Sequence, residues 1–196
     1  MATTRENKTI SQFKSQLIGG GARPNLFEVE LTTLPAGIAW PADNFRYMCK
    51  AAQLPESTIA NIDIPFRGRI FKVAGDRTIA PWSITVINDE DFRIRKAMEE
   101  WVDFIAKLEN NLGATDPNAY MVNAKVFQLG RASTPSSKNN AGDRNAVLRE
   151  YEFIDIFPTS VSSIDLSYDS SDTIEEFTVD FAVQLFAFVD AGGPNG

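Results

Sequence analysis

The strongest constraint on the fold is an alternation of apolar and polar side chains, with a period of two, that returns along most of the chain. It is clearest near the C-terminal end, where Phe177, Val179, Phe181, Val183 and Leu185 alternate with polar or small residues. A period of two places successive side chains on opposite faces of a strand, so one face of each segment is expected to be buried. Similar runs predict strands at 25–31, 44–52, 62–66, 69–73, 82–86, 120–126, 149–157 and 164–168.

One segment follows a different period. Apolar residues from Ile94 to Leu108 recur at spacings of four and three, which predicts one amphipathic helix over about residues 90–109. Asn88 or Asp89 is a suitable N-cap, and the acids that follow suit the positive end of the helix dipole. The predicted fold class is mainly β: two packed antiparallel sheets, as a sandwich or barrel, with one flanking α-helix.

The chain length of 196 residues fits one domain with extensions. We expect this domain to cover residues 22–189. Residues 1–21 are predicted to form a mobile N-terminal arm with a short helix near its end, and residues 190–196 a flexible tail. Residues 131–146 are rich in Ser, Asn and Gly and predict a long exposed loop. Turns inside the domain are predicted at Ala74–Arg77 and Pro158–Thr159.

Composition argues against the common kinds of catalytic site. The chain has no histidine and a single cysteine, Cys49, in an apolar context that predicts a core position. We therefore expect no enzyme, and no catalytic, metal or cofactor site. The net charge of −7 disfavours tight binding of nucleic acid, although an acidic wall lets a strand slide past without sticking. The sequence predicts neither a secretory signal nor stable membrane insertion.

Two features leave alternatives open. Acidic residues such as Glu99 and Glu175 are compatible with a carbohydrate-binding β-sandwich or a hydrolase, but only if carboxylates converge in a cleft. The segment from Phe153 to Phe157 carries apolar residues on both faces of its predicted strand. Burial on both faces indicates either cover by the helix or contact with a neighbouring subunit.

Several short strings in a fixed order add a further indication. They are Ala22–Val29, Val73–Thr78, Thr85–Glu90, Phe157–Val161 and Ile174–Val179, together with Cys49–Ala51, Leu54–Pro55, Trp82 and Leu166–Ser170. In this order the set resembles the tail tube proteins of contractile-tailed, myovirus-type bacteriophages, over about residues 22–189.

The resemblance implies a structural virion protein whose hexameric rings stack into a hollow conduit for DNA ejection. It also implies partners: a tail sheath, a tape-measure protein, a baseplate and a tail terminator. DNA would pass through without specific binding, and assembly would take place in the host cytoplasm. The alternative is a tube–baseplate junction protein, or the inner-tube ring of a related contractile injection or type VI-like system.

Three segments are candidates for contacts between subunits or for the lining of the lumen, and the first two are chosen for their mixed charged and apolar faces. The segment from Asp63 to Arg77 and the strand from Glu150 to Phe157 are expected to contribute to the inner barrel or to contacts between rings. The residues from Asp89 to Asp91 are expected at a helix start near an interface. The candidate residues are Asp63, Arg67, Asp76, Arg77, Asp89, Glu90, Asp91, Glu150, Glu152 and Asp155.

Overall fold

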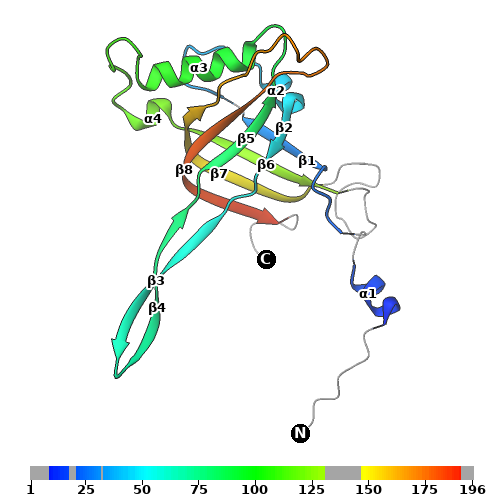
Figure 1. The fold of residues 1–196 in the computed structure, drawn as a ribbon, viewed down its shortest axis with the longest axis vertical. Coiled ribbons are helices and arrows are strands. Elements are labelled where there is room, and N and C mark those ends of the chain that lie inside the picture. Colours follow the sequence, from blue (N-terminus) through cyan, green and yellow to red (C-terminus); the bar gives the residue numbers. More distant parts are fainter. Residues whose placement is uncertain (1–8, 18–20, 32, 131–146, 191–196) are drawn as a thin grey trace.

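Six strands join into one antiparallel sheet that curls almost into a barrel (Figure 1). The computed structural model describes residues 9–17, 21–31, 33–130 and 147–190. The strand order is β1-β6-β7-β8-β5-β2, and the edge strands β1 and β2 approach each other. The bounds are β1 Phe27–Leu31, β2 Cys49–Ala52, β5 Trp82–Ile87, β6 Val122–Leu129, β7 Val147–Val161 and β8 Glu176–Asp190.

A second antiparallel sheet consists of two strands only, β3 Ser57–Phe66 and β4 Arg69–Ile79. The predicted fold class, mainly β with antiparallel sheets and a flanking helix, is confirmed. The loop predicted at 131–146, most of the arm predicted at 1–21 and the tail from 191 onward lie outside the described residues.

Aromatic side chains fill the interior of the six-stranded sheet. The indole of Trp82 stacks on the ring of Phe153 at 4.4 Å between centroids and lies 5.3 Å from that of Phe181. Trp101 reaches the same cluster, 5.9 Å from Phe181. Each of these side chains is at most 2% exposed. The period of two predicted for β5 and β8 is the reason, because it turns every second side chain inward.

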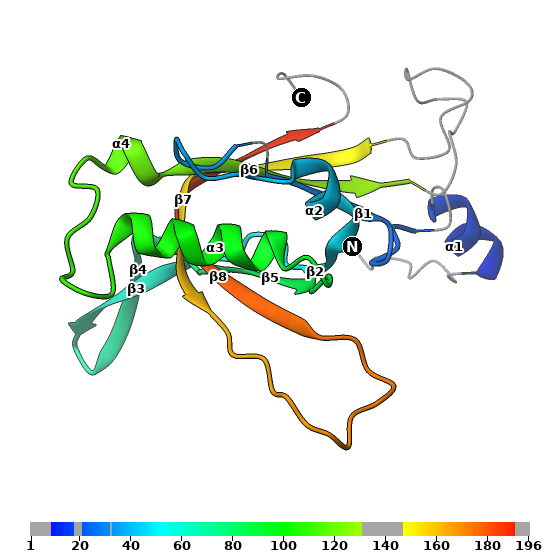
Figure 2. The same cartoon turned by 90° about the horizontal axis from the view of Figure 1, so that it is seen from above.

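The helices of the described ranges are α1 Ile10–Gln16, α2 Ala42–Met48, α3 Arg93–Ile105 and α4 Pro117–Tyr120. The longest, α3, lies alongside the sheet and buries Ile94, Ala97, Met98 and Trp101 (Figure 2). Among the helices of the described ranges, none combines the length and the apolar character needed to cross a membrane.

The prediction of a strand over residues 44–52 is wrong for the first half of this segment, which belongs to α2. Phe45 is fully buried and packs on Trp40, with ring centroids 4.9 Å apart, whereas Tyr47 is 82% exposed. The inward positions are therefore Phe45 and Cys49, four residues apart, which is the spacing of a helix. Four is also a multiple of two, so the sequence pattern alone does not separate the two structures.

The helix predicted over residues 90–109 is shorter, and neither predicted N-cap caps it. Its N-cap is Phe92, in the left-handed region with φ 52°, and its last residue is Ile105. Asn88 is occupied elsewhere, since its backbone and its side-chain amide both donate to Glu175. Asp89 accepts a hydrogen bond from the amide of Asn44 at 2.8 Å. Tertiary contacts thus hold both residues in the connection before the helix.

Strand β7 departs from the prediction at its C-terminal end. The turn predicted at Pro158–Thr159 is a bulge inside the strand, where the pairing with β8 shifts between Pro158 and Ser160. The bulge accommodates a proline, which lacks a backbone N–H to donate. The strand predicted at 164–168 is absent from this described segment, and its members Leu166 and Tyr168 are strongly exposed.

The apolar run in β7 is explained within one chain. Asp155 adopts φ 54° at a shift in pairing with β6, so Phe153 and Ile156 both face the core. Phe157 lies half-buried on the other face, against the ring of Tyr120 in α4 at 5.7 Å. Of the two explanations for burial on both faces, a covering helix or a neighbouring subunit, the helix therefore applies to this segment.

Candidate assembly surface

The two strands β3 and β4 form a hairpin that projects away from the barrel (Figure 1). Their pairing runs from Ser57 opposite Ile79 at the base to Phe66 opposite Arg69 at the tip. Nearly every residue of the hairpin is exposed. A two-stranded hairpin alone in water is only marginally stable, so a hairpin of this length is expected to pack against something else.

The turn at the tip has only two residues, Arg67 and Gly68, with φ angles of 47° and 78°. Two successive positive φ angles match the type I′ turn, whose twist fits that of a hairpin. Glycine adopts this backbone without a steric penalty, whereas arginine does not. The guanidinium of Arg67 lies 5.3 Å from the ring centroid of Phe66, so the tip presents a cation beside an apolar side chain.

One face of the hairpin is apolar. The pairing opposes Ile64 to Phe71 and Ile62 to Val73, and the period of two brings Phe66 to the same face. These five residues, Ile62, Ile64, Phe66, Phe71 and Val73, form what we term the apolar ribbon. Their exposed fractions range from 37% for Val73 to 64% for the two phenylalanines. A contiguous exposed apolar surface of this kind marks a protein interaction site.

The opposite face of the hairpin is mixed. Asp63 opposes Lys72, with a carboxylate oxygen 3.9 Å from the ammonium nitrogen, and Pro65 opposes Ile70. An exposed ion pair at this distance contributes little to stability. The hairpin is thus amphipathic like a strand at the surface of a protein, but its apolar side has no cover in the described chain.

The turn predicted at Ala74–Arg77 is wrong, because β4 continues through it. The pairing shifts between Ile59 and Asn61, so that Gly75 and Asp76 together face the single residue Ala60. This is a β-bulge, which bends a hairpin and increases its twist. A Cβ atom at position 75 would lie 3.0 Å from the carbonyl oxygen of Ala60, which explains the glycine.

The base of the hairpin is fixed to the barrel. The guanidinium of Arg77 lies 5.3 Å from the ring centroid of Phe186 in β8 and donates to the hydroxyl of Ser57 at 2.9 Å. The indole N–H of Trp82 donates to the carbonyl of Gln53 at 2.9 Å. These contacts connect the direction of the hairpin to the packed core.

The four candidates Asp63, Arg67, Asp76 and Arg77 all lie on this hairpin. Arg67 is at the tip, Asp63 on the mixed face, Asp76 in the bulge and Arg77 at the base. Residues 57–79 contain four cationic and two acidic residues, so a basic hairpin extends from a chain of net charge −7.

The second group of candidates lies between β5 and α3. Asp89 is half-buried and bound to Asn44, and Glu90 is exposed. Asp91 forms an ion pair with Arg93. The contacts of this group with Asn44 and Arg93 stabilise the connection before α3, away from the hairpin.

The third group lies on β7, where neighbouring strands bring further charges beside it. Pairing places Glu30, Lys125 and Glu152 in one row across three strands. The ammonium of Lys125 contacts the carboxylate of Glu150 at 2.8 Å, and this hydrogen bond raises the pKa of Lys125. We term Glu30, Lys125, Glu150 and Glu152 the charged face. Asp155 is exposed, and its backbone N–H donates to the side chain of Asn123.

The thiol and the carboxylates that could suggest an enzyme have structural roles in the described chain. Burial raises the pKa of the Cys49 thiol from 9.0 to about 12, which suppresses the nucleophilic thiolate. Glu99 pairs with Arg95 at 2.6 Å on α3, and Glu175 accepts from Asn88.

The feature missed at the level of sequence is the apolar ribbon itself, because only charged residues of the segment were singled out. The sequence does contain a pattern that predicts this surface. Alternating apolar residues on both sides of the Arg67–Gly68 turn predict a hairpin with one apolar face. What the sequence did not show is that this face lacks an internal partner.

A family model described as phage tail tube protein matches residues 22–188. The chain belongs to the phage tail tube protein family. The matched region includes the whole hairpin. Helix α1 lies before it.

Relatives of known role support the same assignment. The tail tube protein gp19 of Enterobacteria phage T4 is 34% identical over 168 residues, covering 86% of this chain and 92% of the relative. Its counterpart in phage T6 is 33% identical with the same coverage. The tail tube protein of Serratia phage KSP90 is 23% identical over 88% of this chain and 92% of its own length.

Solved structures show that the tail tube fold extends further than sequence similarity. A chain of the anti-feeding prophage baseplate has a TM-score of 0.61 at 10% identity, over 88% of this chain and 97% of its own. A chain of the sheath–tube complex of an extracellular contractile injection system has a TM-score of 0.52 at 12% identity, over 94% and 99%. At these identities the likeness concerns the fold.

Proposed function

We propose that this tail tube subunit polymerises through the apolar ribbon of its β3–β4 hairpin. The observation that carries the proposal is a projecting hairpin with five apolar side chains that are exposed in the isolated chain. Burial of apolar surface is the main favourable term in protein association. A second copy of the chain is the partner that a tube of identical subunits supplies.

A contact of this type can build a tube of stacked rings, and the resemblance to tail tube proteins implies that each ring is a hexamer. The hairpin projects from the barrel, and the surface that receives it lies elsewhere on the next copy, so the contact is heterologous. Heterologous contacts that close produce a ring, and those that repeat along an axis produce a tube. The continuous tube is the hollow conduit through which DNA leaves the virion.

The charged face is our candidate for the lining of this conduit. It carries three carboxylates and one ammonium group, and the chain as a whole is acidic. A wall of this sign repels phosphate and keeps DNA from binding during passage. The role is mechanical, and we expect no enzymatic activity.

The remaining partners follow from the place of a tube in a contractile tail. A sheath surrounds it, a baseplate starts it, a terminator ends it and a tape-measure protein lies inside. The structural neighbours come from a baseplate and from a sheath–tube complex, which supports the sheath and the baseplate as partners. We expect assembly in the host cytoplasm and a final location in the virion.

A junction protein between tube and baseplate is the second candidate, because the baseplate chain of the anti-feeding prophage has a TM-score of 0.61 with this chain. The two roles differ in copy number. A tube subunit is present in many rings of each particle, whereas a junction protein forms a single layer. Quantitative mass spectrometry of purified virions separates them.

Electron microscopy of the purified chain tests the proposed function. The wild type is expected to form rings and hollow tubes, with baseplate extract added to start assembly. A variant with Ile64→Thr, Phe66→Thr and Phe71→Thr keeps the β-propensity of the hairpin but removes three members of the apolar ribbon. It is expected to form no tubes while its circular dichroism spectrum is unchanged. A wild type that remains monomeric with the extract present contradicts the proposal.

A further inference from the structure

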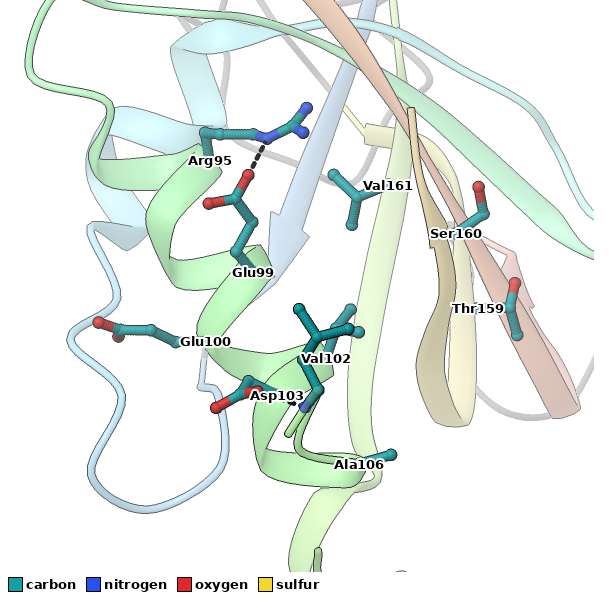
Figure 3. A pocket seen from close by; sticks show the side chains of 10 residues that line it. Arg95, Glu99, Glu100, Val102, Asp103, Ala106, Thr159, Ser160 and Val161 are labelled. Carbon is teal, nitrogen blue, oxygen red and sulfur yellow. Dashed lines mark hydrogen bonds and ion pairs between the residues drawn. The ribbon is translucent and has the colours of Figure 1, made fainter. Parts of the chain in front are cut away.

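A groove of about 540 Å³ lies between α3 and the C-terminal end of β7 (Figure 3). Its apolar lining comes from Val102, Ala106 and Leu108 on or after α3, and from Val161 on β7. Leu108 is 97% exposed and Val102 is 38% exposed, so these apolar surfaces have no cover within the described chain. A concave apolar site of this volume can accept large side chains.

The rim of the groove is acidic. Glu99, Glu100 and Asp103 line it, and Arg95 is the single cation among the lining residues. Arg95 is committed to Glu99 at 2.6 Å and to the carbonyl of Ser162. Glu100 forms an ion pair with Lys96 at 3.7 Å. The carboxylate of Asp103 accepts a backbone N–H but forms no ion pair within the described residues, so it is the rim acid that most needs a cation from a partner. The rim is therefore complementary to a partner that carries positive charge beside apolar side chains.

The tip of the β3–β4 hairpin has this composition. Phe66 and Ile70 are 64% and 63% exposed and flank the turn on its two sides. Arg67 and Arg69 lie between them, and neither forms an ion pair in the part of the chain that the structure describes. An arginine presents several fixed donors, which suits pairing with carboxylates.

The tip and the groove lie at opposite ends of the molecule. Figure 1 shows α3 at one end of the barrel and the hairpin projecting from the other. The hairpin contacts the barrel at its base through Arg77 and Phe186 and points away from α3, so its tip does not contact the groove of its own chain. Contact between them therefore requires a second copy, in the same orientation and displaced along the direction of the hairpin.

We propose that the α3 groove is the receptor for the hairpin tip of a second copy of this chain, in the adjacent ring. Phe66 or Ile70 enters the apolar part of the groove, and Arg67 and Arg69 pair with the acidic rim. The inference rests on the proposed function, because it names the surface that completes the contact between rings. The apolar ribbon further along the hairpin then packs on the flank of the same neighbour.

Disulfide cross-linking tests the contact directly. The double variant Arg69→Cys/Asp103→Cys is expected to give a ladder of covalent oligomers on a non-reducing gel after mild oxidation of tubes. Each single variant and the control pair Arg69→Cys/Asp43→Cys, whose second cysteine lies on α2, are expected to give none. The native Cys49 is buried and does not interfere. Intact tubes without a ladder from the double variant overturn the groove as receptor and leave the proposed function standing.

Filling the groove supplies a second, independent measurement. Val102→Trp places a large side chain where the tip is expected to enter. We expect single rings by size-exclusion chromatography with light scattering, and a critical concentration for tubes at least ten-fold above that of the wild type. A thermal melt controls for folding. Tubes at the wild-type concentration overturn the proposal, whereas a wild type without rings or tubes overturns the proposed function itself.

The sheath protein is the alternative partner for the α3 groove. One labelling experiment distinguishes it from the hairpin tip of a second copy. A thiol reagent applied to the Asp103→Cys variant is expected to react in unassembled chains and to be blocked in tubes without sheath. A cysteine that stays reactive in such tubes and is blocked only when sheath protein is added overturns the proposal.

Discussion

Replacement of Phe71 by threonine is expected to weaken assembly strongly and to leave the isolated chain almost unaffected. A phenylalanine buries about 150–250 Å² when fully covered. Because Phe71 is 64% exposed, roughly 100–160 Å² of this area is available to a neighbouring copy. At about 25 cal/mol per Å² that burial contributes roughly 2.5–4 kcal/mol, and threonine retains part of it. A net loss of about 2 kcal/mol corresponds to an association constant about 30-fold lower.

The assay is the critical concentration for tube formation, measured by sedimentation over a dilution series. Each copy contributes one hairpin, so the critical concentration of Phe71→Thr is expected to rise by this factor of about 30. The free energy of unfolding of the unassembled chain should change by less than about 0.5 kcal/mol, as is usual at the surface.

The matched control applies the same substitution inside the barrel. Phe153 is fully buried beside Trp82, and Phe153→Thr is expected to destabilise the isolated chain by about 3–5 kcal/mol. The reasoning is refuted if Phe71→Thr polymerises at the wild-type critical concentration. It is equally refuted if this variant unfolds as readily as Phe153→Thr, since the ribbon would then be covered within the chain.

Three further outcomes are expected. Gly75→Val forces a Cβ against the Ala60 carbonyl, so it should redirect the hairpin and reduce tube yield while the melting temperature of the barrel changes little; straight tubes in normal yield contradict this. Burial raises the pKa of Cys49 to about 12, so its thiol should resist alkylation at pH 8 until denaturant is added. The stability due to its neutral form is complete below about pH 9 and declines as the pH rises toward 12, which denaturant titrations at several pH values can check. Glu150→Lys/Glu152→Lys should slow DNA release from otherwise intact particles, as followed with a DNA-binding dye; unchanged release places the charged face outside the bore.

The core strands could be predicted from the sequence because their burial follows directly from a period of two. Trp82, Ile84 and Val86 face inward as expected, as do Phe177 and Phe181. The prediction failed for α2, because the inward pair Phe45 and Cys49 satisfies both a helical and an extended pattern. Local periodicity decides between the two only when a segment is long enough to break one of them.

The ends of elements depended on contacts between distant parts of the chain. Asn88 is a good N-cap by residue type, yet Glu175 binds it from 87 positions away, and the helix starts later. The α3 groove was beyond prediction for the same reason. Its two walls, Val102 and Val161, come from segments that only the fold brings together.

The hairpin also makes each newly synthesised chain prone to aggregation before it assembles. Until a neighbour covers it, its two strands present free edges and exposed Ile and Phe side chains, the combination from which disordered aggregates grow. Pro65 removes one backbone donor from an edge, and Asp63 and Lys72 put charge on the face that stays wet, so strands from stray chains pair poorly there. The hairpin therefore favours tubes over disordered aggregates in two ways. Its apolar side chains bind the correct neighbour, and its missing donor and its charges weaken pairing with stray strands.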